Sequence, residues 1–532
     1  ASDLERTDIN FVIGRINDFS MDNKSYPHWG KVREAHVAVA QSLSNAAWVN
    51  TDDLNGKKNG IHATDDGYIT LGKRFANKSI ELIKSNAQKR HSADHPLFEN
   101  DWTSLRKHQT PQWLIDAKFG IYCHWGIQTI SYQKGKENLS PDELIPLFIG
   151  ENFNADKWAE LFETAGAKFG GVVGWHGSDF KHWDSQYSDY NSFKMGPKID
   201  IVEEIAKAVK KRGMKFLVSY HAIRSDDWIN YAKEGVDKYD PDIFWVDASF
   251  GGTKRGHHEK TLRYSKYIGE AKKTTPAFPE KYQREFITHY YNKAIERGKE
   301  VELMYKSHDI PPGVGMRDLE NGILSKMPYD VWITDMDMTV PPDWKTHGWF
   351  YREGVPQRSA NELVDMLVDV VSKNGLFLLN IPPMADGTFP QEVVENLTQL
   401  GEWLQRNGEA IYGTSPWFIY GQGPSEIPEG NYTYHHNNHF AQISYTKEDI
   451  RFTVKGDNLY ATCLGKPEGN LKIEALNSGF KLRKGDVVSI VHLGSGKKVK
   501  LEHNDEALEL MLGNIPLDEF ANAFRIELKF DL

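Results

Sequence analysis

The sequence predicts an α/β chain: a (β/α)8-like TIM barrel, followed by an antiparallel β-sandwich and preceded by a small α/β segment. Helix-like and strand-like patterns alternate through the middle of the chain, which favours a parallel α/β architecture. Near the C-terminus the pattern changes to short strand-like runs separated by Gly, Asn and Asp, which is typical of a sandwich.

Composition limits the classes of protein to consider. A chain of 532 residues is too long for a single core, so we expect two or three domains, one of them barrel-sized. The net charge of -10 argues against nucleic acid and against an anionic membrane surface as partners. No apolar run reaches about 18 residues, so we expect no membrane span. Cys123 and Cys463 fall in different predicted domains and imply neither a disulfide framework nor a cysteine metal site.

The first segment, residues 1–87, contains a buried-strand candidate at 11–14 and two helix-like stretches at 31–44 and 70–85. Residues 88–100 are polar and rich in charge, as in a linker.

The barrel is predicted over residues 101–416 and the sandwich over residues 417–532. In the barrel we expect helices at 157–165, 201–212 and 360–373, and strands at 170–173, 215–220 and 376–380. In the sandwich we expect strands at 440–445, 450–454 and 487–491.

The apolar run 243–247 carries Trp245 and ends in Asp247. In a barrel the C-terminal ends of the strands carry the chemistry, so Asp247 is a candidate nucleophile. An aspartate in this position can also simply cap the next helix or turn.

Ordered motifs between Trp113 and Trp417 resemble the α-L-fucosidases of glycoside hydrolase family 29. They include His124-Trp125-Gly126 and the segments 183–191, 376–388 and 401–414. The resemblance implies a barrel with a C-terminal β domain and an exo-acting, retaining hydrolase that releases terminal α-L-fucose without a cofactor or metal ion. It also implies a carbohydrate as the partner, and for such an enzyme we expect a periplasmic or secreted location. The sequence is compatible with a homo-oligomer.

The same resemblance implies roles for individual residues. Asp247 would be the nucleophile. The acid/base would be Glu320, in a segment like that of several relatives, or Asp335, with loop residues such as Glu259 also open. Sugar contacts are implied for six residues, with His221 and Trp228 as weaker candidates: His124, Trp125, His176, Tyr220, Trp245 and Trp349.

The chain departs from the family pattern at residues 175–180. True fucosidases usually have two adjacent histidines here, whereas this chain has His176 followed by Gly177, and Trp175 replaces a lysine. Loss of one imidazole removes a hydrogen-bond partner and opens space beside the sugar, which can change specificity. The alternative substrates are α-L-galactosides or decorated, for example sulfated, sugars of algal polysaccharides.

Residues 59–68 resemble the end of an SGNH-type carbohydrate esterase, in which an Asp-x-x-His block supplies two triad members. Here the block begins with Asn59 and ends with His62, and asparagine cannot act as the charged partner of the histidine. We therefore expect a partial, non-catalytic esterase-like segment.

Two rival classes remain. A catalytically inactive, sugar-binding relative would explain the missing histidine and the altered esterase block together. A metal-dependent hydrolase would need a ligand set such as His257-His258-Glu259, but this run lacks the His-Glu-x-x-His spacing and is typical of a solvated loop.

Overall fold

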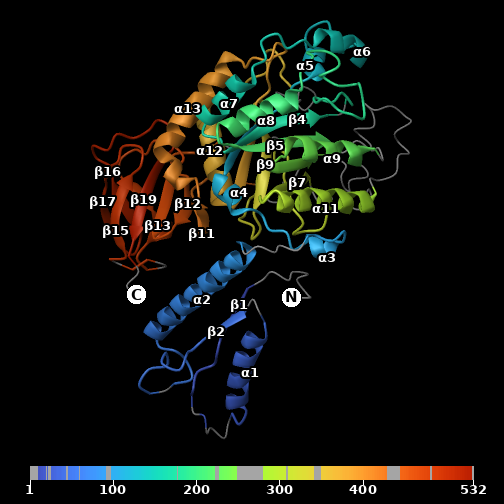
Figure 1. The fold of residues 1–532 in the computed structure, drawn as a ribbon. Helices are drawn as coiled ribbons and strands as arrows, with labels where there is room; N and C mark the ends of the chain where they lie inside the picture. The colour runs from blue at the N-terminus through green and yellow to red at the C-terminus, as the bar shows by residue number, and fades with distance from the viewer. Residues whose placement is uncertain are drawn as a thin grey trace. The chain divides into compact units, whose positions relative to one another are not determined.

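The structure is a computed structural model that divides into two compact units, residues 1–98 and 99–531 (Figure 1). It describes residues 10–19, 21, 26–43, 46–58, 60–91, 97–176, 178–221, 227–247, 279–306, 310–340, 349–427, 444–479, 482–483 and 485–529. Within these ranges, no helix combines the length and the apolar character that crossing a membrane requires.

The N-terminal unit is a two-stranded parallel sheet with two helices. Strands β1 (Phe11–Gly14) and β2 (Ala46–Val49) pair in register, and helices α1 (Trp29–Ser42) and α2 (Asp65–His91) follow them. Strand β1 is only partly buried, in contrast to the prediction, because two strands and two helices enclose little apolar volume. Helix α2 extends beyond the predicted 70–85 at both ends and into the stretch predicted as linker.

The second unit contains a closed barrel of eight parallel strands among the described residues, which confirms the predicted fold class. Their order around the barrel is β10-β3-β4-β5-β6-β7-β8-β9. The strands are β3 (Phe119–Cys123), β4 (Phe169–Trp175), β5 (Lys215–His221), β6 (Ile243–Asp247), β7 (Glu302–Lys306), β8 (Met316–Asp318), β9 (Trp332–Asp337) and β10 (Gly375–Asn380).

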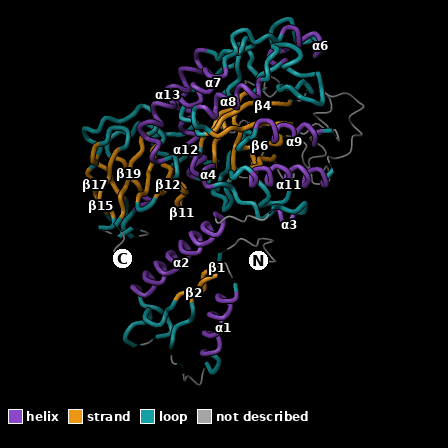
Figure 2. The backbone as a smooth tube through the Cα atoms, viewed as in Figure 1, coloured by secondary structure: helices purple, strands orange, loops and turns teal. Residues whose placement is uncertain are grey.

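Helices cover the outside of the barrel strands (Figures 1 and 2). They include α7 (Ala155–Thr164), α8 (Ile201–Lys211), α9 (Trp228–Tyr239), α11 (Glu280–Glu296), α12 (Ala360–Ser372) and α13 (Gln391–Asn407). Helices α7, α8 and α12 coincide with three of the predicted helices to within about two residues. Between β7 and β9 the described residues 310–315 and 319–331 form no helix, so this part of the barrel departs from strict strand–helix alternation.

The barrel interior is filled by alternate residues of the strands. One apolar cluster includes Tyr122, Leu217, Trp245 and Met304 from four different strands. Because side chains of a strand alternate between its two faces, the residue two positions after each of these also points inward. Residues 124, 219, 247 and 306 are those positions, so the packed core determines which polar side chains face the barrel axis.

The C-terminal part is an antiparallel β-sandwich, as predicted. A six-stranded sheet (order β11-β12-β13-β19-β15-β16) and a three-stranded sheet (order β14-β18-β17) enclose an apolar core. The strands are β11 (Ser415–Gln422), β12 (Ile450–Lys455), β13 (Asn458–Cys463), β14 (Leu471–Ile473), β15 (Val487–His492), β16 (Lys497–Lys498), β17 (Lys500–His503), β18 (Leu508–Met511) and β19 (Asn522–Leu528). The strand predicted at 440–445 lies mostly outside the described residues, and residues 444 and 445 are not in a strand.

A buried ion-pair cluster joins the barrel to the sandwich. Asp369 of α12 accepts hydrogen bonds from Arg451 Nε of β12 at 2.7 Å and from Lys373 Nζ at 2.8 Å. Burial alone would raise the pKa of Asp369, but the charges of Lys373 and Arg451 lower it below its usual value. The lowered pKa means that the pairs stabilise the fold above the unfolded-state pKa of about 4, and that this stabilisation is lost as the pH falls through the folded-state value.

We predict that Asp369→Asn lowers the free energy of unfolding by about 3–5 kcal/mol at neutral pH, because two buried cations lose their counter-charge. Urea denaturation at pH 7 measures the loss. The difference from the wild type should shrink at acidic pH, where Asp369 becomes protonated. Glu468→Gln, which removes the exposed pair with Lys447, is the matched control and should leave the transition unchanged.

Candidate active site

Polar side chains from all eight strands meet at one end of the barrel. Parallel strands place their C-terminal ends together, and each strand either ends in a polar residue that faces the axis or leads into one. The set comprises His124, His176, His221, Asp247, Lys306, Asp318, Glu320, Asp335 and Asn380. Five of the predicted site residues are therefore brought close together: His124, His176, Asp247, Glu320 and Asp335.

Three histidines form one side of the site. The ring centroids of His124 and His176 are 5.4 Å apart, and those of His176 and His221 are 4.2 Å apart. Each ring contributes one nitrogen atom, and these three nitrogens lie within 4.8 Å of one another. Such a group of nitrogens could surround either a metal ion or sugar hydroxyls. His221, which the sequence indicated only as a weaker candidate for a sugar contact, therefore belongs to the site.

Asn380 determines which nitrogen of His124 carries the proton. The Nδ2 group of Asn380 donates to Asp337 Oδ1 (2.9 Å) and to the carbonyl of Trp349 (2.7 Å), so its Oδ1 atom is an acceptor. His124 Nδ1 lies 3.0 Å from that oxygen and must donate to it. His124 Nε2 is then a buried acceptor, and it has no hydrogen-bond partner among the described residues.

The histidines are neutral near pH 7. Burial is the main cause of the lowered pKa of each ring, and it brings the pKa of His221 to about 3 with a further contribution from Lys306. Neutral imidazoles keep an acceptor lone pair, which a protonated ring would lose.

Asp247 lies at the end of β6 beside a histidine and a lysine. Its Oδ2 atom is 3.1 Å from His221 Nε2, although the ring is not aligned for a hydrogen bond, and its Oδ1 atom is 3.7 Å from Lys306 Nζ. Trp228 donates from Nε1 to the carbonyl of His221 at 3.0 Å and so supports this strand end.

Glu320 lies two residues beyond the end of β8, close to the same lysine. Its Oε2 atom is 3.2 Å from Lys306 Nζ, and its Oε1 atom accepts a hydrogen bond from Trp349 Nε1 at 3.2 Å. The Trp349 ring stacks against His124, with centroids 5.5 Å apart. Glu320 and Asp247 thus share a neighbour, so their oxygens are at most about 7 Å apart, a bound that includes the spacing of about 5 Å in retaining glycosidases.

Asp335 lies deeper, inside β9 rather than beyond its end. Both of its oxygens are 3.0 Å from Lys306 Nζ, and Oδ2 accepts a hydrogen bond from the Tyr122 hydroxyl at 3.3 Å. Burial raises the pKa of Asp335 to about 6, with Lys306 opposing the rise and Glu320 adding to it. Its side chain is 1 % exposed, against 6 % for Glu320, so Glu320 is the more accessible of the two acid candidates.

Two of the predicted sugar contacts point away from the site. Tyr220 is on the helix-facing side of β5, where it stacks on Trp183 at 4.5 Å. Trp125 is buried, donates to the carbonyl of Met384 at 2.9 Å and stacks on Phe153 at 5.1 Å. Trp125 directly follows the inward-facing His124, and Tyr220 directly precedes the inward-facing His221. Because successive side chains point to opposite faces, both point outward. Trp245 does face inward, with its ring under the Lys306 ammonium at 4.9 Å.

The sequence analysis missed Lys306, Asp318 and Asn380. Each of these residues is the last residue of its strand and follows inward-facing apolar residues. A polar residue at the end of such a strand is the sequence signal that could have identified them. Gly177, Glu259 and the run 257–259 lie outside the described residues.

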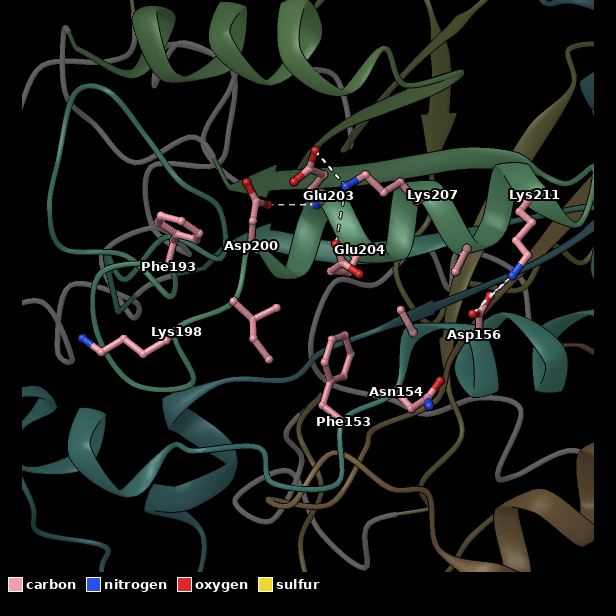
Figure 3. Close-up of a pocket in the computed structure, with 13 residues that line it drawn as sticks. Phe153, Asn154, Asp156, Phe193, Lys198, Asp200, Glu203, Glu204, Lys207 and Lys211 are labelled. Atoms are coloured by element: carbon pink, nitrogen blue, oxygen red, sulfur yellow. Dashed lines mark hydrogen bonds and ion pairs between the residues drawn. The ribbon is translucent and has the colours of Figure 1, made fainter.

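A separate cavity of about 670 Å³ lies beside α7 and α8 (Figure 3). Part of its charged lining is paired internally, with Lys207 3.0 Å from Glu203 and Lys211 3.2 Å from Asp156. None of the strand-end residues lines it, so this cavity is distinct from the histidine–carboxylate site.

Comparison with known proteins agrees with this geometry. The α-L-fucosidase family matches residues 85–409, and the family of sialic acid-specific acetylesterases among the carbohydrate esterases matches residues 1–81. Mouse tissue α-L-fucosidase is 27% identical over 435 residues, which cover 72% of this chain and 85% of the relative. Human plasma α-L-fucosidase is 28% identical over 388 residues, which cover 62% of this chain and 74% of the relative.

The similar solved structures are also α-fucosidases. The α-fucosidase of Thermotoga maritima in complex with fucose has 26% sequence identity and a TM-score of 0.61, and the match covers 81% of this chain and all of that one. With the family matched over more than half of its length, this chain belongs to the α-L-fucosidase family and is a glycoside hydrolase.

Proposed function

We propose that the protein is an exo-acting, retaining α-L-fucosidase that releases terminal α-L-fucose from oligosaccharides or polysaccharides. The observation that carries the proposal is the pair of carboxyl groups, Asp247 and Glu320, which lie 3.7 Å and 3.2 Å from the same lysine at the C-terminal end of the barrel. The family match supports the fucoside as substrate.

In the first step a carboxylate oxygen of Asp247 attacks C1 while the bond from C1 to the leaving oxygen breaks, and Glu320 transfers its proton to that oxygen. In the second step Glu320 takes a proton from water, the water oxygen attacks C1, and Asp247 leaves as a carboxylate. The accessible position of Glu320 and its hydrogen bond from Trp349 support this assignment over Asp335.

The histidines are proposed to hold the sugar hydroxyls. His124 Nε2 and His176 Nδ1 are buried and have no hydrogen-bond partners among the described residues, a state that costs free energy until a ligand supplies a donor. Because a hydroxyl donates a single hydrogen bond, two neighbouring hydroxyls of one sugar would satisfy the two nitrogens. His221, close to Asp247 and supported by Trp228, would position the nucleophile.

For the N-terminal unit we propose a non-catalytic role. The position expected to hold the triad carboxylate is Asn59 in the sequence, and His62 is exposed.

The protein should hydrolyse 4-nitrophenyl α-L-fucoside in preference to 4-nitrophenyl α-L-galactoside, with α-fucose as the first product seen by proton NMR. Asp247→Ala should lower kcat by a factor on the order of 10⁴ or more. The matched control is Asp365→Asn: burial raises the pKa of Asp365 to about 8, so asparagine replaces an already neutral group outside the site. Preference for the galactoside would identify Gly177 as a specificity determinant and refute the fucoside assignment.

Glu320→Ala should lose about 10²–10⁴-fold in kcat on fucosides with poor leaving groups, which need protonation, and far less on the 2,4-dinitrophenyl fucoside. Added azide should accelerate turnover of the activated substrate and give the α-fucosyl azide, because azide attacks the β-fucosyl ester of Asp247 from the opposite face and needs no general base. The same pattern in Asp335→Asn, with Glu320→Ala unaffected, would assign the acid/base to Asp335 instead.

Esterase activity offers a simple check on the N-terminal unit. The chain should not hydrolyse 4-nitrophenyl acetate above the buffer rate, because no complete triad is present in the sequence. Turnover that disappears in His62→Ala would contradict this.

A further inference from the structure

Lys306 is enclosed by four carboxyl groups at the catalytic end of the barrel. Its Nζ atom lies 3.0 Å from Asp318, 3.0 Å from Asp335, 3.2 Å from Glu320 and 3.7 Å from Asp247, and its side chain is 3 % exposed. The two-carboxylate mechanism uses only two of these groups. Asp318 and Asp335 are buried acids for which that mechanism has no role.

The negative charge of the proposed reaction moves between two neighbours of this lysine. When Asp247 forms the glycosyl ester it loses its charge, and in the same step Glu320 gains one by losing its proton. The second step returns the charge to Asp247. An ammonium group in contact with both carboxylates therefore faces the same total charge in every state of the cycle.

We propose that Lys306 is the shared counter-charge of the two catalytic carboxylates, and that Asp318 and Asp335 position its ammonium group between them. The inference rests on the proposed hydrolysis, which it deepens. Lys306 is a positioning residue here, because it acts through Asp247 and Glu320.

The surroundings of Lys306 fit this role from every side. Asp335 holds the ammonium with both oxygens, and its backbone N–H donates to Asp318 Oδ1 at 3.1 Å, which links the two buried acids. The Trp245 ring lies under the ammonium at 4.9 Å and the Trp349 ring at 5.9 Å. The titratable groups that face the cluster from the remaining strands are Tyr122, His124, His176 and His221, and none of them carries a charge near neutral pH.

The protonation states agree with the geometry. Burial opposes the charge on Lys306, but the four carboxyl groups outweigh it and raise its pKa well above the usual value. Burial and the neighbouring Asp335 raise the pKa of Asp318 well above its usual value, while Lys306 opposes the rise. The cluster therefore keeps Lys306 as a cation at neutral pH.

The test is the pH profile of kcat/KM, whose acidic limb reports ionisation of the nucleophile. Removing a cation at this distance should raise the pKa of a carboxylate, so Lys306→Met should move the acidic limb upward by about 1–3 pH units. Lys306→Arg keeps the charge and should return the limb toward the wild-type position. Asp335→Asn removes a like charge and frees the ammonium, so it should move the limb downward.

A purely structural role would not produce shifts of opposite sign. Lys373→Met is the matched control, because it also breaks a buried lysine–aspartate pair, 2.8 Å long, but at the sandwich contact. It should lower the melting temperature and leave both limbs in place. A folded Lys306→Met enzyme with the wild-type limb, or with a shift of the same sign as Asp335→Asn, overturns the proposal. If Lys306→Met does not fold, an unmoved limb in Asp335→Asn overturns it.

Carbon-13 NMR titration of the labelled carboxyl groups separates this inference from the proposed function, since it needs no turnover. We expect the titrations of Asp247 and Glu320 to move to higher pH in Lys306→Met. An inactive wild-type protein that shows these shifts would remove the hydrolase assignment and leave the charge role intact. An active wild-type protein without such shifts would remove the charge role alone.

Discussion

Burial of one ammonium group among four carboxyl groups is the constraint on which the catalytic end of this barrel depends. Without Lys306, the charge shared by Asp247 and Glu320 would lie beside Asp335 in a poorly solvated space with no counter-charge, and protonation of Asp247 would remove the nucleophile. With Lys306 in place, Asp247 can stay ionised near Glu320. The arrangement costs desolvation free energy, which supports a catalytic reason for it more than a stabilising one.

The barrel holds the ammonium in place through its apolar interior. Trp245 and Met304 fill the layer directly below the site, and the strand period of two then turns Asp247 and Lys306 toward the same axis. Asn380 links the neighbouring polar groups, because its side chain forms hydrogen bonds with His124, with Asp337 and with the carbonyl of Trp349. The position of Trp349 is thus tied to the same polar layer.

The sequence predicted the parts of the structure where apolar runs are uninterrupted. The predicted strands 215–220 and 376–380 correspond to β5 and β10, and the prediction that chemistry lies at a strand end placed Asp247 correctly at the end of β6. Strands β7, β8 and β9 were not predicted, because charged residues shorten their apolar runs: Glu302 and Lys306 occupy the two ends of β7, β8 is only three residues long, and Asp335 lies within β9. Tyr220 was misplaced for a related reason: position along a strand was considered, but not which face of the strand the residue occupies.

The cation that balances the carboxylates also acts on the histidines. Burial is the main reason that the His221 ring is neutral, and Lys306 is the next largest. A neutral imidazole retains the lone pair that a sugar hydroxyl can use, whereas a protonated ring beside Asp247 would form an ion pair and neutralise the nucleophile. One buried lysine therefore helps to separate the site into two chemical halves, with a carboxyl pair that shares one negative charge for catalysis and neutral imidazoles for recognition. This division explains why a lysine, whose charge persists throughout the pH range of the reaction, suits the position better than a fourth histidine would.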